Sequence, residues 1–343
     1  MRVFVTGGTG LVGSHVIARL AEHGHAVRAL VRSAAARHAV EALGAAAADG
    51  VVEDERSWEA ARDCDLIVHA AAIVVTPDTW QRYREINVEA TRLAVRAAAA
   101  AGARLILVSS VAVYGRRPEG ARSGPVDEKA AFGPIAAADF YARSKRDAEA
   151  ALWRDAERFG VSAIALRPCV IYGERERLFM AKLLGALRFR IAPIVGSGRN
   201  TLSMIYVGNV VDAIERAIVR PDVTGAFNVA NDGGLTQRTL YDVIGSEAGH
   251  RIRTVRVPVP LAVSVGRTWQ MAHRLARPGR YTGVGSASGH FLGSENPFTS
   301  AKAHDILGWQ PQTDPQVGLR RTVRWFLDQY PALLPWRAES GGE

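Results

Sequence analysis

Cysteine is scarce in this sequence, and long apolar runs are missing. Two cysteines, Cys64 and Cys169, stand far apart among 343 residues and in no metal-ligand spacing. This usage argues against a disulfide framework, predicts no metal site and fits a reducing compartment. No run of about twenty apolar residues occurs, and the chain opens on an apolar strand pattern instead of a charged leader with an apolar core. We therefore expect a soluble cytoplasmic protein with no integral membrane segment.

Dense blocks of one charge are also missing. The chain has 43 Lys and Arg against 34 Asp and Glu, a net charge of +9, which could indicate nucleic acid, an anionic membrane surface or anionic ligands as partners. The arginines are scattered through an alanine-rich sequence without interleaved aromatics, so we expect no nucleic-acid partner. Apolar residues make up 48% of the chain and charged residues 22%, which is ordinary for a folded protein with a full core.

A glycine-rich turn directly after the first strand pattern is the strongest local signal. Residues Met1–Gly13 read MRVFVTGGTGLVG, and a helical pattern follows over Ser14–His23. Strand, glycine turn and helix in this order are typical of dinucleotide binding. The glycines allow positive φ, close approach of the backbone to a pyrophosphate, and close packing of the helix on the strand. The helix N-terminus offers unpaired N–H groups to the phosphates.

The second predicted strand ends on arginine, where an acidic residue is missing. Ala26–Val31 reads as a buried strand, and Arg32 and then Arg37 follow it. An acid at this point binds the 2′-hydroxyl of NAD, whereas arginine suits the 2′-phosphate of NADP. Because Val31 and Arg32 take the acid's place, we expect NADP(H), with NAD as the less favoured cofactor. The alternative is that both arginines are only solvated surface.

Short apolar segments alternate with helical patterns along the first half of the chain. Helices are predicted near residues 57–62, 80–102 and 140–159, between strands near 26–31, 45–48, 66–69, 104–109 and 162–166. This alternation predicts an α/β fold with a doubly wound parallel sheet. Residues 226–229 read as one more strand of the same sheet, so the second lobe is not expected to be a clean C-terminal block.

The second strong signal is YARSK at Tyr141–Lys145. Four residues apart on a helix, the phenol and the ammonium share one face. A free phenol has a pKa of about 10, and a nearby ammonium with an oxidised nicotinamide would bring the pKa of Tyr141 toward the working range. Ser109 and Ser110, at the end of a predicted strand, can place a hydroxyl beside the reacting oxygen. The set predicts proton transfer by Tyr141 to or from a carbonyl/alcohol pair.

The chain resembles the extended short-chain dehydrogenase/reductases, the NAD(P)-dependent epimerase/dehydratase-like group, over nearly its whole length. The motifs that carry the resemblance are TGGTGLVG, HAAA at His69–Ala72, INVEAT with Asn87, LVSSVAVYG at Leu107–Gly115, YARSK, LRPCVIYG at Leu166–Gly173 and YVGNVVDA at Tyr206–Ala213.

The resemblance implies a Rossmann-type NAD(P)-binding domain, assigned to residues 1–166, and a smaller C-terminal substrate lobe over most of 167–343, with segments near 204–230 returning to the first domain. It implies a catalytic set of Ser110, Tyr141 and Lys145, Ser110 being chosen by its spacing to Tyr114. The positions that would bind the cofactor are Gly7, Gly10, Leu11, Val12, Arg32, Val51, Val52, Ala70, Ala71, Ala72, Asn87, Ser109, Tyr141, Lys145, Pro168, Cys169 and Val170.

Two departures from the family pattern bear on the ligands. The family usually has an Asp followed by an aliphatic residue near the adenine, whereas this chain reads Asp49-Gly50-Val51-Val52. Either Asp49 is displaced, or the backbone of Val51–Val52 holds the adenine. Nucleotide-sugar members often carry Arg-Asp-Phe before the YV motif, with the Arg on a phosphate. Leu202-Ser203-Met204 stands there, so a less charged substrate is expected unless Arg199 substitutes.

Two segments, GSGRNTLSMIYVGNVVDA at 196–213 and NPFTSAKAHDILGW at 296–309, resemble the 3β-hydroxysteroid dehydrogenase and dihydroflavonol reductase-like branch. We therefore expect an NADP(H)-preferring oxidoreductase that interconverts a secondary alcohol and a ketone on a mainly apolar, sterol-, flavonoid- or keto-acid-like molecule. An NAD-dependent nucleotide-sugar epimerase or dehydratase is the alternative. A cofactor-sensing scaffold without turnover is a further one, against which the intact Ser110-Tyr141-Lys145 set argues.

Residues 255–279 pair the apolar stretch Val257–Val265 with Arg267, His273, Arg274 and Arg277. Such a segment is expected to form a lid or lobe helix with a solvated basic face, and a peripheral membrane contact is the alternative. The resemblance also implies a homodimer through the helices near Trp80–Gly102 and Phe140–Phe159.

Overall fold

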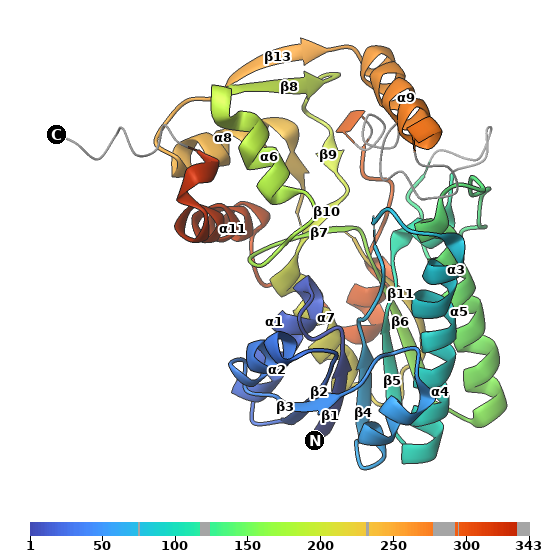
Figure 1. Ribbon diagram of the computed structural model, residues 1–343. Helices are drawn as coiled ribbons and strands as arrows, with labels where there is room; N and C mark the ends of the chain where they lie inside the picture. Colours follow the sequence, from blue (N-terminus) through green and yellow to red (C-terminus); the bar gives the residue numbers. More distant parts are fainter. Residues whose placement is uncertain (75, 117–123, 231–232, 277–291, 294, 335–343) are drawn as a thin grey trace.

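Seven parallel strands form the central sheet of the computed structural model (Figure 1), which describes residues 1–343 except 75, 117–123, 231–232, 277–291, 294 and 335–343. The strand order is β11-β6-β5-β4-β1-β2-β3. The strands are β1 (Arg2–Thr6), β2 (Ala26–Val31), β3 (Ala46–Asp49), β4 (Leu66–His69), β5 (Arg104–Val108), β6 (Ala163–Pro168) and β11 (Gly225–Val229). This is the predicted doubly wound α/β architecture, with the order reversing between β1 and β4.

Helices cover both faces of this sheet because strand residues alternate between two cores. Val3 and Val5 face a core built with α1 (Leu11–Glu22), α2 (Ala34–Glu41) and α7 (Val207–Ile218). Phe4 faces the opposite core, built with η1 (Glu55–Ala61), α4 (Ala90–Ala101) and α5 (Phe140–Phe159). Buried on both faces, the strands are nearly continuous apolar runs, as a parallel sheet requires. Two short helical elements, α3 (Trp80–Tyr83) and η2 (Arg84–Glu89), lead directly into α4.

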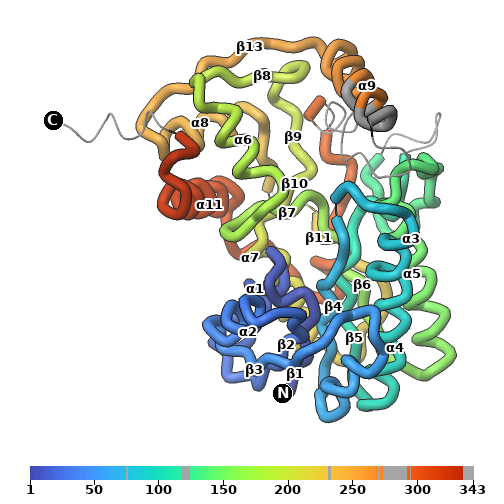
Figure 2. The backbone as a smooth tube through the Cα atoms, viewed as in Figure 1, coloured from blue at the N-terminus to red at the C-terminus, as the bar shows by residue number. Residues whose placement is uncertain are grey.

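A second lobe stands above the carboxyl ends of the sheet strands (Figures 1 and 2). It has its own core, formed by residues such as Leu184, Ile194, Leu240 and Phe326. The short parallel pair β7 (Val170–Tyr172) and β10 (Met204–Tyr206) lies at its base. Its other elements are α6 (Met180–Ala186), η4 (Leu187–Phe189), β8 (Ile191–Val195), β9 (Thr201–Leu202), β12 (Leu235–Thr236), α8 (Gln237–Glu247), β13 (Arg253–Val257), α9 (Val259–Ala276), α11 (Pro315–Gln329) and η6 (Pro331–Leu333).

Segments from the C-terminal half return to the first core. β11 pairs with β6 along its whole length, and η5 (Ala303–Leu307) and Trp309 pack into the core beside α7. Both α7 and β11 lie within the segment near 204–230 that was predicted to return to the first domain. The division at residue 166 stays a prediction, and β6 continues beyond it to Pro168.

Several predicted element ends are displaced in the structure. The first helix begins at Leu11 instead of Ser14, because the glycine turn passes directly into helical backbone. β6 continues through Arg167 and Pro168, where the strand was expected to stop. Pro168 is tolerated as the last residue, since its missing N–H removes only a terminal ladder bond. The segment 255–279 becomes the end of β13 and α9. Residues 277–279, with Arg277, lie outside the described residues, as do the side chains of His273 and Arg274.

Candidate active site

The glycine turn at the carboxyl end of β1 has the shape that a pyrophosphate needs. Gly7 has φ +72°, a value that favours glycine, and its carbonyl accepts a hydrogen bond from Gly10 N at 2.9 Å. An added Cβ on Gly13 would lie 2.2 Å from the Gly7 carbonyl oxygen, and one on Gly7 would lie 2.7 Å from Ala71 N. The turn, α1 and the loop after β4 therefore approach one another more closely than any side chain allows.

The start of α1 is left open for an anion. Gly10 is the N-cap and has no side chain to cap the helix, and the first turn contains no acidic residue. The N–H groups of Leu11 and Val12 consequently receive no capping side chain and carry the positive end of the helix dipole. Such a donor set fits the phosphates of a dinucleotide. The positions Gly7, Gly10, Leu11 and Val12 lie in this turn and helix start, and their contact with a cofactor stays a prediction.

The two arginines after β2 differ in their surroundings. Arg32 is exposed at the end of the strand. Arg37 forms ion pairs with Asp49 at 2.6 Å and with Glu41 at 3.3 Å, and the hydrogen bond that it donates to Asp49 is the main cause that raises the pKa of Arg37. Asp49 is opposite Val31 in the β2–β3 register. The carboxylate of Asp49 is thus turned to Arg37.

The backbone of Val51 and Val52 is largely engaged within the chain. The N–H of Val51 donates to Ser57 Oγ at 3.1 Å, and the carbonyl of Val52 accepts from Trp58 Nε1 at 3.0 Å. The Val51 side chain is exposed. These two hydrogen bonds fix the loop after β3. They leave the side chain of Val51 on the surface, at the position predicted for the adenine.

Hydrogen bonds with two polar side chains, Thr6 and Asn87, hold the loop after β4, which contains Ala70, Ala71 and Ala72. Thr6 Oγ1 accepts from Ala71 N at 3.3 Å. Asn87 accepts from Ile73 N at 2.8 Å and donates to Ile73 O at 3.0 Å and to Ser144 Oγ at 2.8 Å. Asn87 is buried and ties this loop to α5. Its contacts within the chain explain why an amide, with donors and acceptor on one side chain, stands there.

Tyr141, Ser110 and Lys145 come together at the carboxyl end of β5. Lys145 is buried and its Nζ donates to the Val108 carbonyl at 2.9 Å. Burial lowers the pKa of Lys145 to about 8, against the charge of Glu149, which raises it. Burial raises the pKa of Tyr141, while a hydrogen bond with Ser110 opposes the shift. The sequence predicted a lowered phenol pKa, whereas within the chain itself desolvation is the larger effect.

A buried ionic network that the sequence analysis missed lies behind this set. Arg167 donates to both carboxylate oxygens of Glu149, with the shortest contact 2.6 Å from Nη2 to Oε2, and to Tyr114 Oη at 2.9 Å. Ser109 Oγ also donates to Glu149. Both charged side chains are no more than 5% exposed. Glu149 stands one helical turn after Lys145, and this spacing was the available signal.

Burial alone would lower the pKa of Arg167, but the hydrogen bonds and charge of Glu149 raise it above its usual value. The Tyr114 hydroxyl continues the network by donating to Asn228 Oδ1 at 2.8 Å on β11. The network thus ties two strands, β6 and β11, to α5 and to the segment after β5 that carries Ser109 and Tyr114. Ser109, predicted to touch the cofactor, turns its hydroxyl into this network.

His69, part of the HAAA motif, is a second buried polar residue that sequence reasoning left without a role. Its Nδ1 is hydrogen-bonded to Thr6 Oγ1 at 2.7 Å, and its Nε2 has no partner among the described residues. Burial, with the positive charge of Lys145, lowers the pKa of His69 to about 3. The ring is therefore neutral at physiological pH.

The remaining predicted cofactor positions, Pro168, Cys169 and Val170, lead from β6 into β7. Cys169 is buried, with its thiol donating to Ala230 O at 3.6 Å, whereas Val170 is partly exposed.

Residues 202–204 stand where nucleotide-sugar members often carry a phosphate-binding Arg. Leu202 and Met204 are buried, and Ser203 Oγ donates to Asn296 Oδ1 at 3.0 Å. Arg199 is exposed. No cation points inward from these places.

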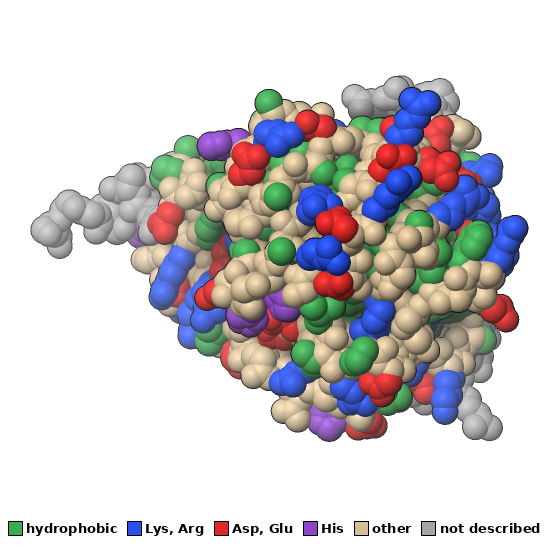
Figure 3. All heavy atoms as spheres, turned by 90° about the horizontal axis from the view of Figure 1, so that it is seen from below, with side chains coloured by type: hydrophobic (Ala, Val, Ile, Leu, Met, Phe, Trp, Pro, Cys, Tyr) green, Lys and Arg blue, Asp and Glu red, His purple; other side chains and the backbone are tan. Residues whose placement is uncertain are grey.

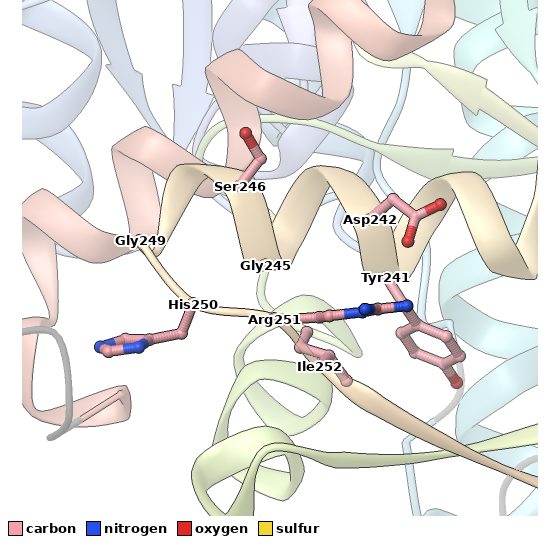
Figure 4. A pocket seen from close by; sticks show the side chains of 8 residues that line it. All are labelled: Tyr241, Asp242, Gly245, Ser246, Gly249, His250, Arg251 and Ile252. Carbon is pink, nitrogen blue, oxygen red and sulfur yellow. The ribbon is translucent and has the colours of Figure 1, made fainter.

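A surface pocket of about 330 Å³ lies apart from the catalytic set, beside α8 (Figure 4). Its lining includes Tyr241, Asp242 and Arg251, and none of the predicted site residues belongs to it. Among the described residues no cluster of His, Cys, Asp and Glu has the arrangement of a metal site. Over the same residues, every helix is too short or too polar to span a bilayer.

Fold and site together define the class of dinucleotide-binding α/β enzymes, since the open helix start after β1 and the Tyr141–Lys145 pair beside the end of β5 both lie at the carboxyl edge of the parallel sheet. Within that class the chain belongs to the NAD dependent epimerase/dehydratase family, whose model matches residues 3–230. It is therefore an NAD(P)-dependent enzyme of the extended short-chain dehydrogenase/reductase type, which confirms the resemblance drawn from the motifs.

Curated relatives match nearly the full chain. A 4-hydroxy-2-methyl-3-oxo-4-farnesyl-3,4-dihydroquinoline-1-oxide ketoreductase from Stigmatella aurantiaca is 28% identical, over 93% of this chain and 95% of the relative. A 3-beta-hydroxysteroid dehydrogenase from Mycolicibacterium neoaurum is 26% identical, over 98% and 94%. The structure of UDP-glucuronic acid 4-epimerase from Bacillus cereus with UDP-glucuronic acid and NAD has a TM-score of 0.74 at 18% identity and covers 96% of this chain and all of that one. This last likeness shows the fold.

Proposed function

We propose that the protein is an NADP(H)-preferring oxidoreductase that interconverts a secondary alcohol and a ketone on a mainly apolar small molecule. The observation that carries the proposal is the set at the end of β5, in which the buried Lys145 is anchored on Val108 O and the half-buried Tyr141 is hydrogen-bonded with the buried Ser110. A phenol, a hydroxyl and an ammonium in one water-poor site are the groups that carbonyl reduction requires.

In the reducing direction Tyr141 donates its phenolic proton to the carbonyl oxygen. Its raised pKa keeps the phenol protonated at neutral pH, so the donor is ready before reaction. Ser110 donates a hydrogen bond to the same oxygen and stabilises the negative charge that develops on it. In the oxidising direction Tyr141 accepts the proton, and the Lys145 ammonium then stabilises the phenolate.

The cofactor would be held by the N–H groups at the start of α1, by Arg32 and by Lys145, and the bound nicotinamide supplies or accepts the hydride. Arg32 supports NADP(H), because its exposed guanidinium at the end of β2 suits a 2′-phosphate. Arg37 adds less than the sequence suggested, since Asp49 and Glu41 already balance its charge.

Two observations support an apolar substrate. The positions where nucleotide-sugar enzymes often place a phosphate-binding arginine hold the buried Leu202 and Met204. The relatives named above are, by their names, a ketoreductase of a farnesylated quinoline oxide and a hydroxysteroid dehydrogenase. A sterol-, flavonoid- or keto-acid-like carbonyl compound fits a site whose described residues 202–204 include no arginine for a phosphate.

The first experiment is a titration of the purified protein with NADPH and NADH, after mass spectrometry has shown whether a nucleotide was retained. A free site that binds NADPH more tightly supports the proposal. Arg32→Gln should then weaken NADPH binding by roughly tenfold, the scale of one charged hydrogen bond, and leave NADH binding nearly unchanged. Arg56→Gln, at an exposed arginine on η1, is the matched control.

The alternative is an NAD-dependent nucleotide-sugar epimerase or dehydratase. The engagement of Arg37 by Asp49 favours it, because a single arginine then remains for the 2′-phosphate. Retained NAD, weak NADPH binding and binding of a UDP- or dTDP-sugar would replace the reductase proposal with this one. Tyr141→Phe tests both against the scaffold interpretation, since a variant with unchanged function would mean that the fold acts without turnover.

The cytoplasmic location and the homodimer stay predictions. The helices proposed for the dimer contact, α4 and α5, pack against each other on one face of the sheet. Sedimentation equilibrium of the full chain measures the dimer directly.

A further inference from the structure

The elements β8, β13 and α9 form the end of the second lobe farthest from the central sheet (Figures 1 and 2), and they expose several large apolar side chains. We call this surface the lobe tip; its apolar members are Phe189, Ile191, Val255, Leu261, Val265 and Met271. Each is more than half exposed, and three of the four most exposed large apolar residues in the described chain are among them. Single exposed apolar residues are ordinary, but such a cluster on neighbouring elements indicates an interaction surface.

The strand register explains how β8 and β13 contribute to the lobe tip. Ile191 is opposite Arg253, and Val255 is opposite Pro193. The residues of β8 that alternate with Ile191 and Pro193 along the strand, Ala192 and Ile194, are buried in the lobe core. Because side chains alternate along a strand, Ile191, Pro193 and Val255 share the outer face of this two-stranded sheet.

Helix α9 follows β13 and continues the apolar surface. Val263 is buried, while Leu261 and Val265, four residues apart, lie together on the opposite, solvent side. Met271 is exposed on the flank of this row, whereas Arg267, also exposed, lies on another side of the helix, because two residues turn an α-helix by about 200°. Leu261 and Val265 have no covering element among the described residues.

The lobe tip is positively charged throughout. The exposed arginines beside its apolar residues are Arg188 on η4 and Arg253 on the outer face of β13. No Asp or Glu occurs in residues 177–211 or in residues 248–294, which together contain twelve Lys and Arg, more than the net charge of +9 of the whole chain. The rest of the chain is therefore slightly acidic. Seen from below, the opposite end of the molecule shows both charges interspersed (Figure 3).

We propose that the lobe tip docks on an anionic lipid bilayer, with its apolar side chains between the headgroups and its arginines on the lipid phosphates. Apolar and basic residues on one surface, with no acid, are what interfacial binding requires. A second copy of the chain is a poorer occupant, because two lobe tips would bring arginines together without a carboxylate to pair them. The proposal does not rest on the catalytic function.

The test is co-sedimentation of the full chain with large vesicles. Vesicles of phosphatidylcholine with about a third phosphatidylglycerol are compared with vesicles of phosphatidylcholine alone, a contrast that isolates the charge contribution. We expect binding to the anionic vesicles at low salt and a fall of at least tenfold in affinity as salt rises through the range where the Debye length shrinks from about 10 to 3 Å. Equal binding to both vesicle types, or none, overturns the proposal.

Variants locate the surface. The double variant Arg188→Gln and Arg253→Gln should weaken vesicle binding by about 25-fold, since each arginine near a lipid surface contributes on the order of fivefold. Val265→Glu should weaken it further. Val219→Glu is the matched control, because Val219 is 63% exposed and Val265 62% exposed, but Val219 follows α7 outside the lobe tip.

Two results would contradict the assignment. If Val265→Glu and Val219→Glu bind vesicles alike, another surface holds the lipid. If Val265→Glu halves the mass measured by light scattering, the lobe tip is an interface between two copies. Both substitutions lie at exposed positions, and circular dichroism with NADPH titration shows that the variants are folded, so a failed catalytic proposal remains distinguishable from a failed membrane proposal.

Discussion

Glu149→Gln is the perturbation that tests the buried network most sharply. The substitution keeps the shape of the side chain and removes its charge, which leaves the guanidinium of Arg167 buried with only neutral side-chain partners, Tyr114 Oη and the new amide oxygen. Breaking a buried pair by removing one partner costs about 3–5 kcal/mol, because an uncompensated charge stays in a low-dielectric interior. We expect a loss of that size in the free energy of unfolding.

The same substitution acts on Lys145. Glu149 is the charge that raises the pKa of Lys145 against burial, which has lowered it to about 8. Without that carboxylate the pKa falls below 8, so a smaller fraction of Lys145 is charged at neutral pH. If the ammonium is needed to stabilise the Tyr141 phenolate, the alkaline limb of the pH–rate profile in the oxidising direction moves to lower pH.

Two assays measure these effects. Urea unfolding gives the change in stability, and a pH series of kcat/KM with any accepted alcohol gives the shift of the profile. The control is Asp63→Asn, which breaks the Arg28–Asp63 pair, an ion pair with the same 2.6 Å separation but with exposed side chains. This control should barely change stability. Equal effects of Glu149→Gln and Asp63→Asn on unfolding, together with an unmoved profile, would refute the reasoning.

Three further predictions concern the glycine turn and two buried bases. Gly13→Ala should destabilise by about 2 kcal/mol or more and abolish dinucleotide binding, because the added Cβ meets the Gly7 carbonyl at 2.2 Å. The control Gly185→Ala, with its first neighbour at 4.0 Å, should stabilise α6 by about 0.5–1 kcal/mol; calorimetry and fluorescence titration with NADPH decide. Burial lowers the pKa of His69 to about 3 in the folded protein, so between pH 6.5 and pH 3 the unfolded state binds a proton on His69 that the folded state does not. The free energy of unfolding of the wild type should therefore fall by at most about 5 kcal/mol over this range. Unfolding curves taken across the range should show a steeper fall for the wild type than for His69→Asn, and equal slopes would contradict the assignment. Lys145 has its pKa lowered from 10.5 to about 8, so its charged form is disfavoured in the fold, and its contribution should add a few kcal/mol of stability as pH rises from 8 to 10.5. That rise should be absent in Lys145→Met in the same measurement.

The parts of the site that were predictable from sequence are those built from neighbours along the chain. The turn Gly7–Gly13 and the pair Tyr141–Lys145 each lie within one element or one turn, so spacing alone fixes which groups face the same side. The parallel sheet followed from alternation, because buried strands are apolar on both faces.

The parts that could not be predicted depend on strand register and on distant partners. Arg167 was read only as a strand end, and nothing local shows that it meets Glu149 on α5 or Tyr114 after β5. The pairing of Arg37 with Asp49 requires β2 and β3 to align Val31 with Asp49. The same alignment decides how much positive charge remains for a 2′-phosphate. Long-range pairing of this kind enters through the tertiary fold and leaves no periodic pattern in the sequence.

The chain crosses between its two lobes several times, and this path makes them inseparable. It leaves the sheet after β6, returns for α7 and β11, builds most of the second lobe, and returns again so that Trp309 Nε1 donates to Asn209 O at 2.9 Å. The last helix, α11, then goes back to the core of the second lobe. No single cleavage of the backbone yields two complete halves, so each lobe reaches its native packing only when the other is also formed. Folding and unfolding are therefore expected to be one cooperative event across both cores.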